Sequence, residues 1–269
     1  MHAMARTTDN RTASSPWAWA MAGAVCGALW AVLQWAPASW VQQAAYAASA
    51  GRVVLSESRG TLWHGSAQFG LTGGLGSAGG LRLPGRVQWD LRLGLGSLHV
   101  ALRADCCTLA PQLLELTPGL RSWRLQLAPG ESTWPAAVLA GLGTPWNTVQ
   151  LQGPLLLKTP GLNVVSAVDR VHVEGALSLD MVGPSSSLST LRPLGSYQLS
   201  LQGSDQGGAT LKLRTLDGNL QLQGTGGWTA GRLHFVGEAR ADAASEAELS
   251  NLLNIMGQRD GARSVITLG

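Results

Sequence analysis

From about residue 50 onward, apolar and polar residues alternate along the chain. In VQWDLRL (87–93) the odd-numbered positions are apolar and the even-numbered positions are polar. The same pattern recurs at 98–104, 123–127, 148–153, 197–203, 210–216, 219–224 and 232–237. Glycines separate these runs, and LDGNL (216–220) is typical of a tight hairpin. A period of two with one apolar side predicts a mostly β fold, an antiparallel sheet with one packed face and one solvated face.

Two segments are expected to be helical. One is the apolar N-terminal run, which we expect to continue through SWVQQAAYAASA (39–50). The other is SEAELSNLLNIMGQ (245–258), in which Ser245 and Glu248 have the spacing of a capping box and Gly257 is expected to end the helix. Its apolar stripe consists of Leu249, Leu252, Leu253 and Met256. We expect this stripe to pack on the sheet of the same chain, with docking of a partner as the alternative. A last short strand is predicted at 264–269.

Two stretches of the chain resemble each other at an offset of 110 residues. Arg-x-x-Gly-x-x-Gln-x-x-Leu occurs at 82–91 and again at 192–201. After one added residue, HVALR (99–103) corresponds to TLKLR (210–214). This echo predicts two related strand sets, an internal repeat of 60–104 and 170–214.

The N-terminal region contains a run of twenty residues, Trp17–Ala36, without a charge. Arg6 and Arg11 precede it, and the next basic residue is Arg52. Such a run predicts a single transmembrane helix at 17–36, with residues 1–16 in the cytoplasm and 51–269 as a periplasmic β-rich domain. A cleaved signal peptide is the alternative, with small residues for cleavage at 36–38 and 44–50. The length of the run favours an uncleaved anchor, because signal-peptide apolar regions usually span about 7–15 residues.

The chain has three cysteines. Cys26 lies in the apolar run, where it is expected to act as a small apolar residue. Cys106 and Cys107 are adjacent, and in an oxidising compartment two thiols tend to pair. Ordinary disulfide geometry does not favour a bridge between neighbours. A bridge and a pair of free thiols both remain open.

The sequence contains no motif for catalysis or for a cofactor. It has no H-E-x-x-H, no Gly-x-Ser-x-Gly and no P-loop, and GLGSAG (74–79) lacks the following helix that a phosphate site needs. The histidines are scattered, and His64 is interpreted as a structural residue. We therefore expect no catalytic, metal or cofactor-binding residues and no small-molecule substrate. The net charge of +3 is spread without a basic cluster, which argues against nucleic acid.

Within RGTLWHGSA (59–67), the segment TLWHGSA (61–67) is interpreted as a short strand that is entered and left through Gly60 and Gly65. Its Trp63 is expected to be buried against the rest of the sheet. Here the sequence resembles the type II secretion system protein N family (general secretion pathway protein N). In that family an anchor is followed by Gly-[Thr/Ser]-[Leu/Val]-Trp-x-Gly-x-Ala. The residues that fit this motif are Gly60, Thr61, Leu62, Trp63, Gly65 and Ala67. The C-terminal part, with LQGTGGW (222–228) and GRLHFVGEARA (231–241), also looks like the family.

The resemblance implies an inner-membrane protein that is accessory to the export of folded proteins across the outer membrane. It implies contacts with other secretion subunits in the periplasm and transfers no catalytic residues. From the residues alone, an alternative is an anchored periplasmic β protein that binds lipids or other hydrophobes in a groove, because a long alternating sheet can leave apolar surface uncovered. An exported hydrolase whose site cannot be linked by sequence is a third hypothesis.

Overall fold

The computed structural model describes residues 16–74, 80–143, 146–167, 170–204, 208–229 and 232–268. The predicted tail 1–16, apart from its last residue, and most of the glycine-rich stretch 74–79 lie outside the described residues. The chain divides into two compact units, residues 1–36 and 37–269.

The first unit contains the helix α1 (Pro16–Gln34), which carries neither an acidic first turn nor a basic last turn. Its large apolar side chains are exposed, among them Trp17, Trp19 and Trp30. Among the described residues, no helix combines the length and the hydropathy that crossing a membrane requires.

The second unit begins with a new helix, α2 (Ser39–Ala48). The expected continuous helix is therefore interrupted, and Pro37 explains the break. Proline disfavours helical geometry in the residue before it and has no N–H to donate. Pro37 instead forms a bridge with Thr61, and the Ala38 N–H donates to the carbonyl of Gly60 at 3.1 Å.

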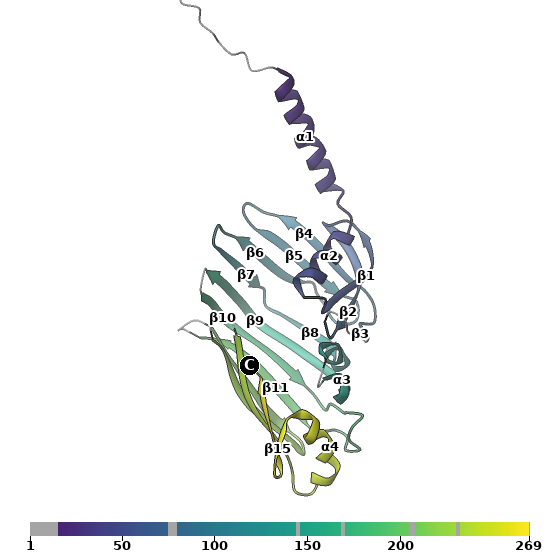
Figure 1. Ribbon diagram of the computed structural model, residues 1–269, viewed down its shortest axis with the longest axis vertical. Coiled ribbons are helices and arrows are strands. Elements are labelled where there is room, and N and C mark those ends of the chain that lie inside the picture. The colour runs from purple at the N-terminus through teal and green to yellow at the C-terminus, as the bar shows by residue number, and fades with distance from the viewer. Residues whose placement is uncertain are drawn as a thin grey trace, which may run out of the picture. The chain divides into compact units, whose positions relative to one another are not determined.

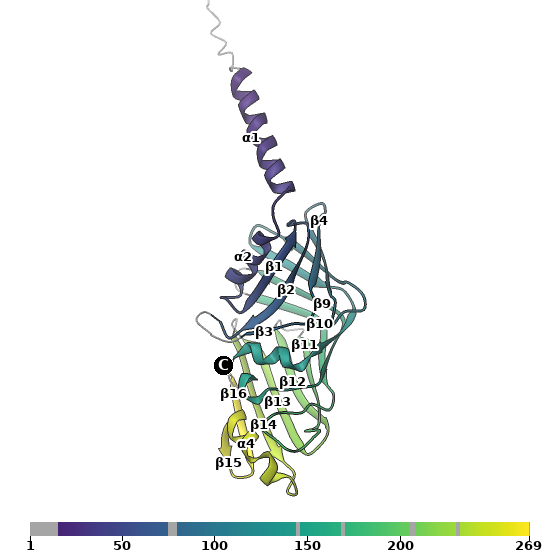
Figure 2. The same ribbon diagram turned by 90° about the vertical axis from the view of Figure 1, so that its right-hand side faces the viewer.

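All strands of the described residues belong to one antiparallel sheet, with strand order β1-β2-β4-β5-β6-β7-β9-β10-β11-β12-β13-β14-β16-β15. β3 pairs with β2, and β8 pairs with β9. The strands are β1 (Val53–Gly60), β2 (His64–Thr72), β3 (Gly80–Arg82), β4 (Val87–Leu93), β5 (Leu98–Ala104), β6 (Gln112–Pro118), β7 (Ser122–Leu127), β8 (Gly130–Pro135), β9 (Pro154–Ala167), β10 (Arg170–Met181), β11 (Ser196–Gly203), β12 (Ala209–Asp217), β13 (Leu220–Thr229), β14 (Arg232–Ala241), β15 (Gln258–Asp260) and β16 (Arg263–Leu268). Figures 1 and 2 show that the strands follow one another along a curved sheet almost in chain order.

The register of the sheet separates an apolar face from a polar face. Directly paired residues of antiparallel strands share a face. Trp89 pairs with Leu102, and Leu199 pairs with both Leu179 and Leu213, so these side chains stand on the apolar face. Charged and amide side chains occupy the intervening positions on the polar face. The mostly β, antiparallel fold predicted from the alternation is thus confirmed.

Helices pack on the apolar face near the first strands, where the 3-10 helix η1 (Ala136–Leu142) also lies against β2 and β3, and near the last strands. Near the first strands, Val41 and Ala45 of α2 lie against a cluster that contains Leu55, Ala67 and Trp89. Near the last strands, α4 (Glu246–Met256) lies over β13, β14 and β16. The predicted stripe of α4 is buried there: Leu249 and Leu253 are fully buried, Leu252 is 1% exposed, and Met256 packs partly against the same cluster.

The connections differ between the two sides of the sheet, meaning the two sets of strand ends. On one side, called the hairpin side here, β1–β2, β4–β5 and β6–β7 are joined by tight turns at 61–63, 94–97 and 119–121. On the opposite side β12–β13 and β15–β16 are joined by tight turns at 218–219 and 261–262, but several other connections are long. They include η1 (Ala136–Leu142), α3 (Trp146–Val149) and the segments 105–111, 182–195 and 242–257.

Two local expectations are wrong. The predicted strand 148–153 begins inside α3, where Val149 is buried in the cluster under α4, so tertiary packing overrides the short alternation there. The helix α4 does begin directly after Ser245, but the Ser245 hydroxyl makes no capping hydrogen bond, and Glu246 instead pairs with Arg259 at 3.2 Å.

The proposed repeat is reflected in one strand pair. Gln88 pairs with Arg103 in β4–β5, and Gln198 pairs with Arg214 in β11–β12, which are the positions that the sequence echo aligns. The preceding pairs differ, because Ser66 faces Gln88 whereas the corresponding Ala176 faces Gln202. The internal duplication stays a prediction.

Candidate functional site

The expectation of a strand over the whole of 61–67 is wrong, because residues 61–63 form the tight turn between β1 and β2 on the hairpin side and β2 begins only at His64. Gly60 has φ +88°, and a Cβ there would collide with the carbonyl of His64, so only glycine fits without strain. The Thr61 N–H donates to the His64 carbonyl at 2.8 Å, and the His64 N–H donates to the Thr61 hydroxyl at 3.1 Å. Thr61 thus holds the turn closed through two hydrogen bonds to the His64 backbone, one from its N–H and one to its hydroxyl.

This turn holds the side chain of Trp89 on β4. The indole N–H of Trp89 donates to the carbonyl of Leu62 at 3.0 Å. Gly65 lies opposite Trp89 in the register, and a Cβ on Gly65 would collide with the indole ring. The neighbouring Ala67 is fully buried beside Trp89. The glycine and the alanine of the motif therefore make room for one tryptophan.

The expectation that Trp63 is the buried tryptophan is wrong. Trp63 lies in the turn before β2 and is only half-buried, whereas Trp89 is 6% exposed. The backbone of Trp63 has a defined role, because its carbonyl accepts a hydrogen bond from the Leu91 N–H at 2.7 Å. The sequence pattern placed Trp89 on the apolar face of a strand but did not link it to the motif. Its place opposite Gly65 was the missing information.

His64 projects onto the polar face beside Asp90. Its Nε2 lies 3.2 Å from the Asp90 carboxylate, and 68% of the His64 side chain is exposed. The nearby Ser66 hydroxyl accepts a hydrogen bond from the guanidinium of Arg86 at 3.1 Å. His64, Ser66 and Asp90 line an open hollow of about 550 Å³, together with Arg59 and others. The arrangement is that of a solvent-exposed histidine–carboxylate contact beside a hydrogen-bonded serine, not of a nucleophile aligned with a base.

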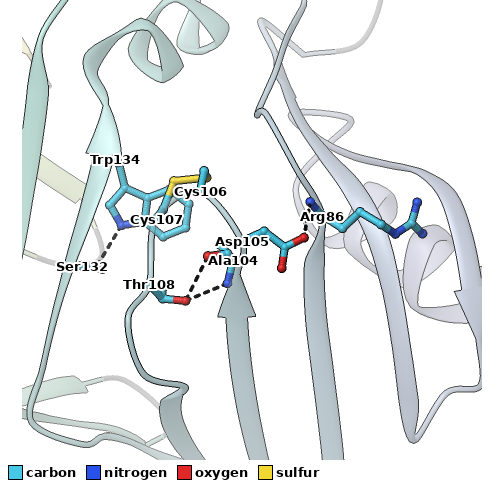
Figure 3. Close-up of a disulfide and its surroundings, with 8 residues drawn as sticks. All are labelled: Arg86, Ala104, Asp105, Cys106, Cys107, Thr108, Ser132 and Trp134. Carbon is cyan, nitrogen blue, oxygen red and sulfur yellow. Dashed lines mark hydrogen bonds between the residues drawn. A yellow bond between two sulfur atoms is a disulfide. The ribbon is translucent and has the colours of Figure 1, made fainter.

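The adjacent cysteines form a disulfide, Cys106–Cys107. Sequence reasoning left this pairing open, and the reason lies in how the turn is held. The Cys107 N–H donates to the Ala104 carbonyl at 2.9 Å, and the Thr108 hydroxyl bonds both backbone groups of Ala104. Figure 3 shows the disulfide beside the indole of Trp134, which donates to Ser132 at 2.8 Å.

The same turn is tied to the neighbouring strands. One carboxylate oxygen of Asp105 accepts a hydrogen bond from the Arg86 N–H at 3.2 Å, and the other accepts one from the Gln88 amide at 2.9 Å. Thr133 of β8 donates its N–H to the carbonyl of Cys107 at 2.8 Å. The disulfide is therefore part of a well-connected turn between β5 and β6.

The titratable groups with a shifted pKa lie away from the motif. Burial raises the pKa of Tyr197, whose hydroxyl donates to the Leu220 carbonyl at 3.0 Å under α4. Hydrogen bonds from Asn163 and His172 hold the pKa of the exposed Glu174 below its usual value. Within the described ranges, no group of His, Cys, Asp and Glu side chains is arranged to hold a metal ion.

The edges of the sheet are the remaining candidate for an interaction surface. At one end β15 has only three residues, which leaves little edge for pairing. At the other end β1 has eight residues and pairs only with β2 in the part of the chain that the structure describes. Thr72 donates its N–H to the Arg52 carbonyl at 2.8 Å, so by alternation the backbone of Leu55 faces the open edge. β1 therefore offers hydrogen-bonding groups to an added strand.

Comparison with known proteins gives one match. The family model described as "Type II secretion system (T2SS), protein N" matches residues 51–266. No curated protein and no solved structure matches the chain.

Proposed function

The chain belongs to the type II secretion system protein N family, and from this we propose that it is an accessory inner-membrane component of the secretion machinery. Membership of the family indicates a role in type II secretion and contacts with other components of the system. The finer proposal is that it aids the export of folded proteins through protein–protein contacts in the periplasm. The observation that carries it is the open β1 edge beside the family motif, because an exposed strand edge is a common surface for pairing with another chain.

A site-specific crosslinking experiment tests the contact. A photoreactive amino acid is placed at Ser56 on β1, and in a control at Ser200 on β11, in the full chain at native expression level. Ser56 lies beside the open edge, whereas Ser200 lies on the polar face in the middle of the sheet. We expect an adduct with another secretion subunit from Ser56 and none from Ser200. The edge mechanism is wrong if Ser56 gives no protein adduct in cells that secrete normally.

Deletion of the gene tests the role in secretion itself. We expect the deletion to lower the amount of exported substrate in the medium, and the intact gene to restore it. Unchanged secretion in the deletion strain under all growth conditions that induce the system would contradict the proposal.

The proposed location is the inner membrane, with the N-terminus in the cytoplasm and the β-rich unit in the periplasm. It is supported by the uncharged run 17–36, by Arg6 and Arg11 before it, and by the exposed apolar side chains of α1. The Cys106–Cys107 disulfide is consistent with an oxidising compartment. A reporter fused after residue 45 should be active outside the cytoplasm, and the mature chain should keep its first residues. A mature N-terminus at residue 39 or beyond would show a cleaved signal peptide.

We propose that the protein acts without catalysis. His64 and Asp90 form an exposed pair, and the Ser66 hydroxyl is bonded to Arg86. His64→Ala should therefore leave both secretion and the unfolding transition unchanged. Loss of secretion with an unchanged unfolding transition would assign His64 a functional role and overturn this part of the proposal.

A further inference from the structure

The middle of the apolar face is covered by no helix of the described residues. α2 packs over the first strands and α4 over the last. Between them, Leu125 on β7, Leu179 on β10, Leu199 on β11 and Leu213 on β12 are only partly buried. The neighbouring strands β6, β7 and β9 contribute no residue to the clusters under α2 and α4, whereas β5, β10 and β11 contribute only near their ends on the side of the long connections. At about 4.8 Å between neighbouring strands, the interval from β5 to β10 has a width of roughly 20 Å.

The chemistry of this face favours hydrocarbon over a polypeptide segment. From β4 to β14 no charged side chain stands on it in the regular register of the described strands. The backbone of these strands is already paired with neighbouring strands, so the face offers nothing to the backbone groups of an extended peptide. An acyl chain has no such groups to satisfy, and it gains free energy from contact with aliphatic side chains alone.

The hairpin side provides a route from a bilayer to this face. At the tips of β4–β5 and β6–β7, Leu95 is 109% exposed and Leu120 is 105% exposed, and Trp123 beside them is 43% exposed. Arg121 and Arg124 flank these apolar tips. Apolar tips with adjacent arginines suit the interface of a membrane with anionic headgroups.

The point at which the chain enters the second unit lies on the same side of the sheet. Pro37, the first residue of this unit, is bridged to Thr61 in the β1–β2 turn. A membrane anchor that ends at residue 36 therefore tethers the hairpin side, with its exposed tips, through a direct covalent link. The long connections with η1, α3 and α4 lie on the opposite side.

We propose that the uncovered middle of the apolar face binds the acyl chains of membrane lipids, which reach it from the hairpin side. The acyl chains of one leaflet extend over roughly 15 Å, half of a hydrocarbon core of about 30 Å, and this length fits within the uncovered width. Binding of lipid goes beyond the contacts with secretion subunits. It rests on the proposed membrane location, which the same experiment reports separately.

The test uses the full chain in its own membrane. Cells that express the chain at native level with the other secretion subunits are grown with a photoactivatable, clickable analogue of palmitic acid, which enters their lipids. After irradiation the chain is purified under denaturing conditions, and the adducts are mapped to residues by mass spectrometry. We expect adducts on Leu179 and Leu199 and none on their neighbour Gln198, which stands on the polar face.

Labelling of residues 17–36 provides the internal reference for membrane location. Adducts in 17–36 without any on the apolar face would overturn lipid binding and leave the membrane location standing. A lack of adducts anywhere in the chain, with the probe recovered in the lipids, would contradict both proposals. Crosslinks from the face to another subunit or to a second copy, in place of lipid, would also overturn the inference.

A matched pair of charged variants gives a second readout. Leu199→Lys places an ammonium group on the apolar face, and Gln198→Lys places it on the opposite face of the same strand. We expect Leu199→Lys to lower the yield of lipid adduct at Leu179 by about tenfold or more, because burying an unpaired charge in hydrocarbon is costly. Gln198→Lys should leave that yield within about twofold of the wild type. Equal yields from both variants, with the chain still folded, would contradict a site on this face.

Discussion

Replacing Trp89 tests whether the family motif exists to hold this tryptophan. Trp89 is 6% exposed, packs with Leu55 and Ala67, and donates its indole N–H to the Leu62 carbonyl. Truncating a buried tryptophan to alanine typically costs about 3–5 kcal/mol, and the lost hydrogen bond is part of that cost. We expect Trp89→Ala to lower the free energy of unfolding by about 4 kcal/mol, a large share of the roughly 5–15 kcal/mol of a typical domain.

Trp63→Ala is the matched control, because it removes the same type of side chain from the turn to which the Trp89 indole is hydrogen-bonded. Trp63 is only half-buried, and its backbone carbonyl keeps its bond to Leu91 in the variant. Its only partial burial predicts a smaller loss, roughly 1–2 kcal/mol. Urea unfolding of the purified full chain is monitored by far-ultraviolet circular dichroism. The two variants are compared if the dependence of the unfolding free energy on urea concentration, the m value, is the same for both. A cost for Trp63→Ala equal to or above that of Trp89→Ala would refute the reasoning.

Three further changes test the packing under α4, the disulfide and a buried hydroxyl. Leu253→Ala should lower the free energy of unfolding in urea by about 3–4 kcal/mol, because Leu253 is fully buried. Asn251→Ala, on the exposed side of α4, should change it by no more than about 0.5 kcal/mol. Near-equal values for the two variants would indicate that the stripe does not pack internally. The double change Cys106→Ser and Cys107→Ser should lower the free energy of unfolding by only about 1 kcal/mol in thermal unfolding, because the bridge closes a loop of two residues. A loss above about 3 kcal/mol would contradict this reasoning. Burial raises the pKa of Tyr197 above its ordinary 10.0, so the unfolded chain loses this proton first and stability should fall as the pH rises above that value. Tyr197→Phe should remove this part of the pH dependence and cost about 1 kcal/mol at neutral pH, and an unchanged alkaline profile would show that another group controls it.

The alternation in the sequence was sufficient for strands whose neighbours in the chain are also neighbours in the sheet. The segments 87–93 and 98–104 have the bounds of β4 and β5, because a tight turn and a regular apolar face determine both. The same reasoning failed at 148–153, where a four-residue helix turns Val149 into the cluster under α4. The sequence pattern of six residues does not reveal which distant residues the segment packs against.

The candidate site was predictable as a motif but not as an arrangement. Two glycines around Trp63 indicated a position where backbone and ring come close, yet the ring belongs to Trp89, 24 residues beyond Gly65. Only the register between β2 and β4 decides which tryptophan fills the space. The pairing of Cys106 with Cys107 depended likewise on a turn held by Thr108 and Asp105, which spacing alone does not reveal.

The nearly sequential strand order has a consequence for how the chain folds. Most strands hydrogen-bond to a strand next to them in the sequence, through turns of only a few residues on the hairpin side. Closing such short loops costs little entropy, and folding is fast where most contacts are local. Each strand can therefore pair with the preceding strand as soon as it has been synthesised. The sheet can grow from β1 toward β16 before the C-terminus is complete. Only α4 and the short β15, which arrive near the end, complete the cover of the last strands.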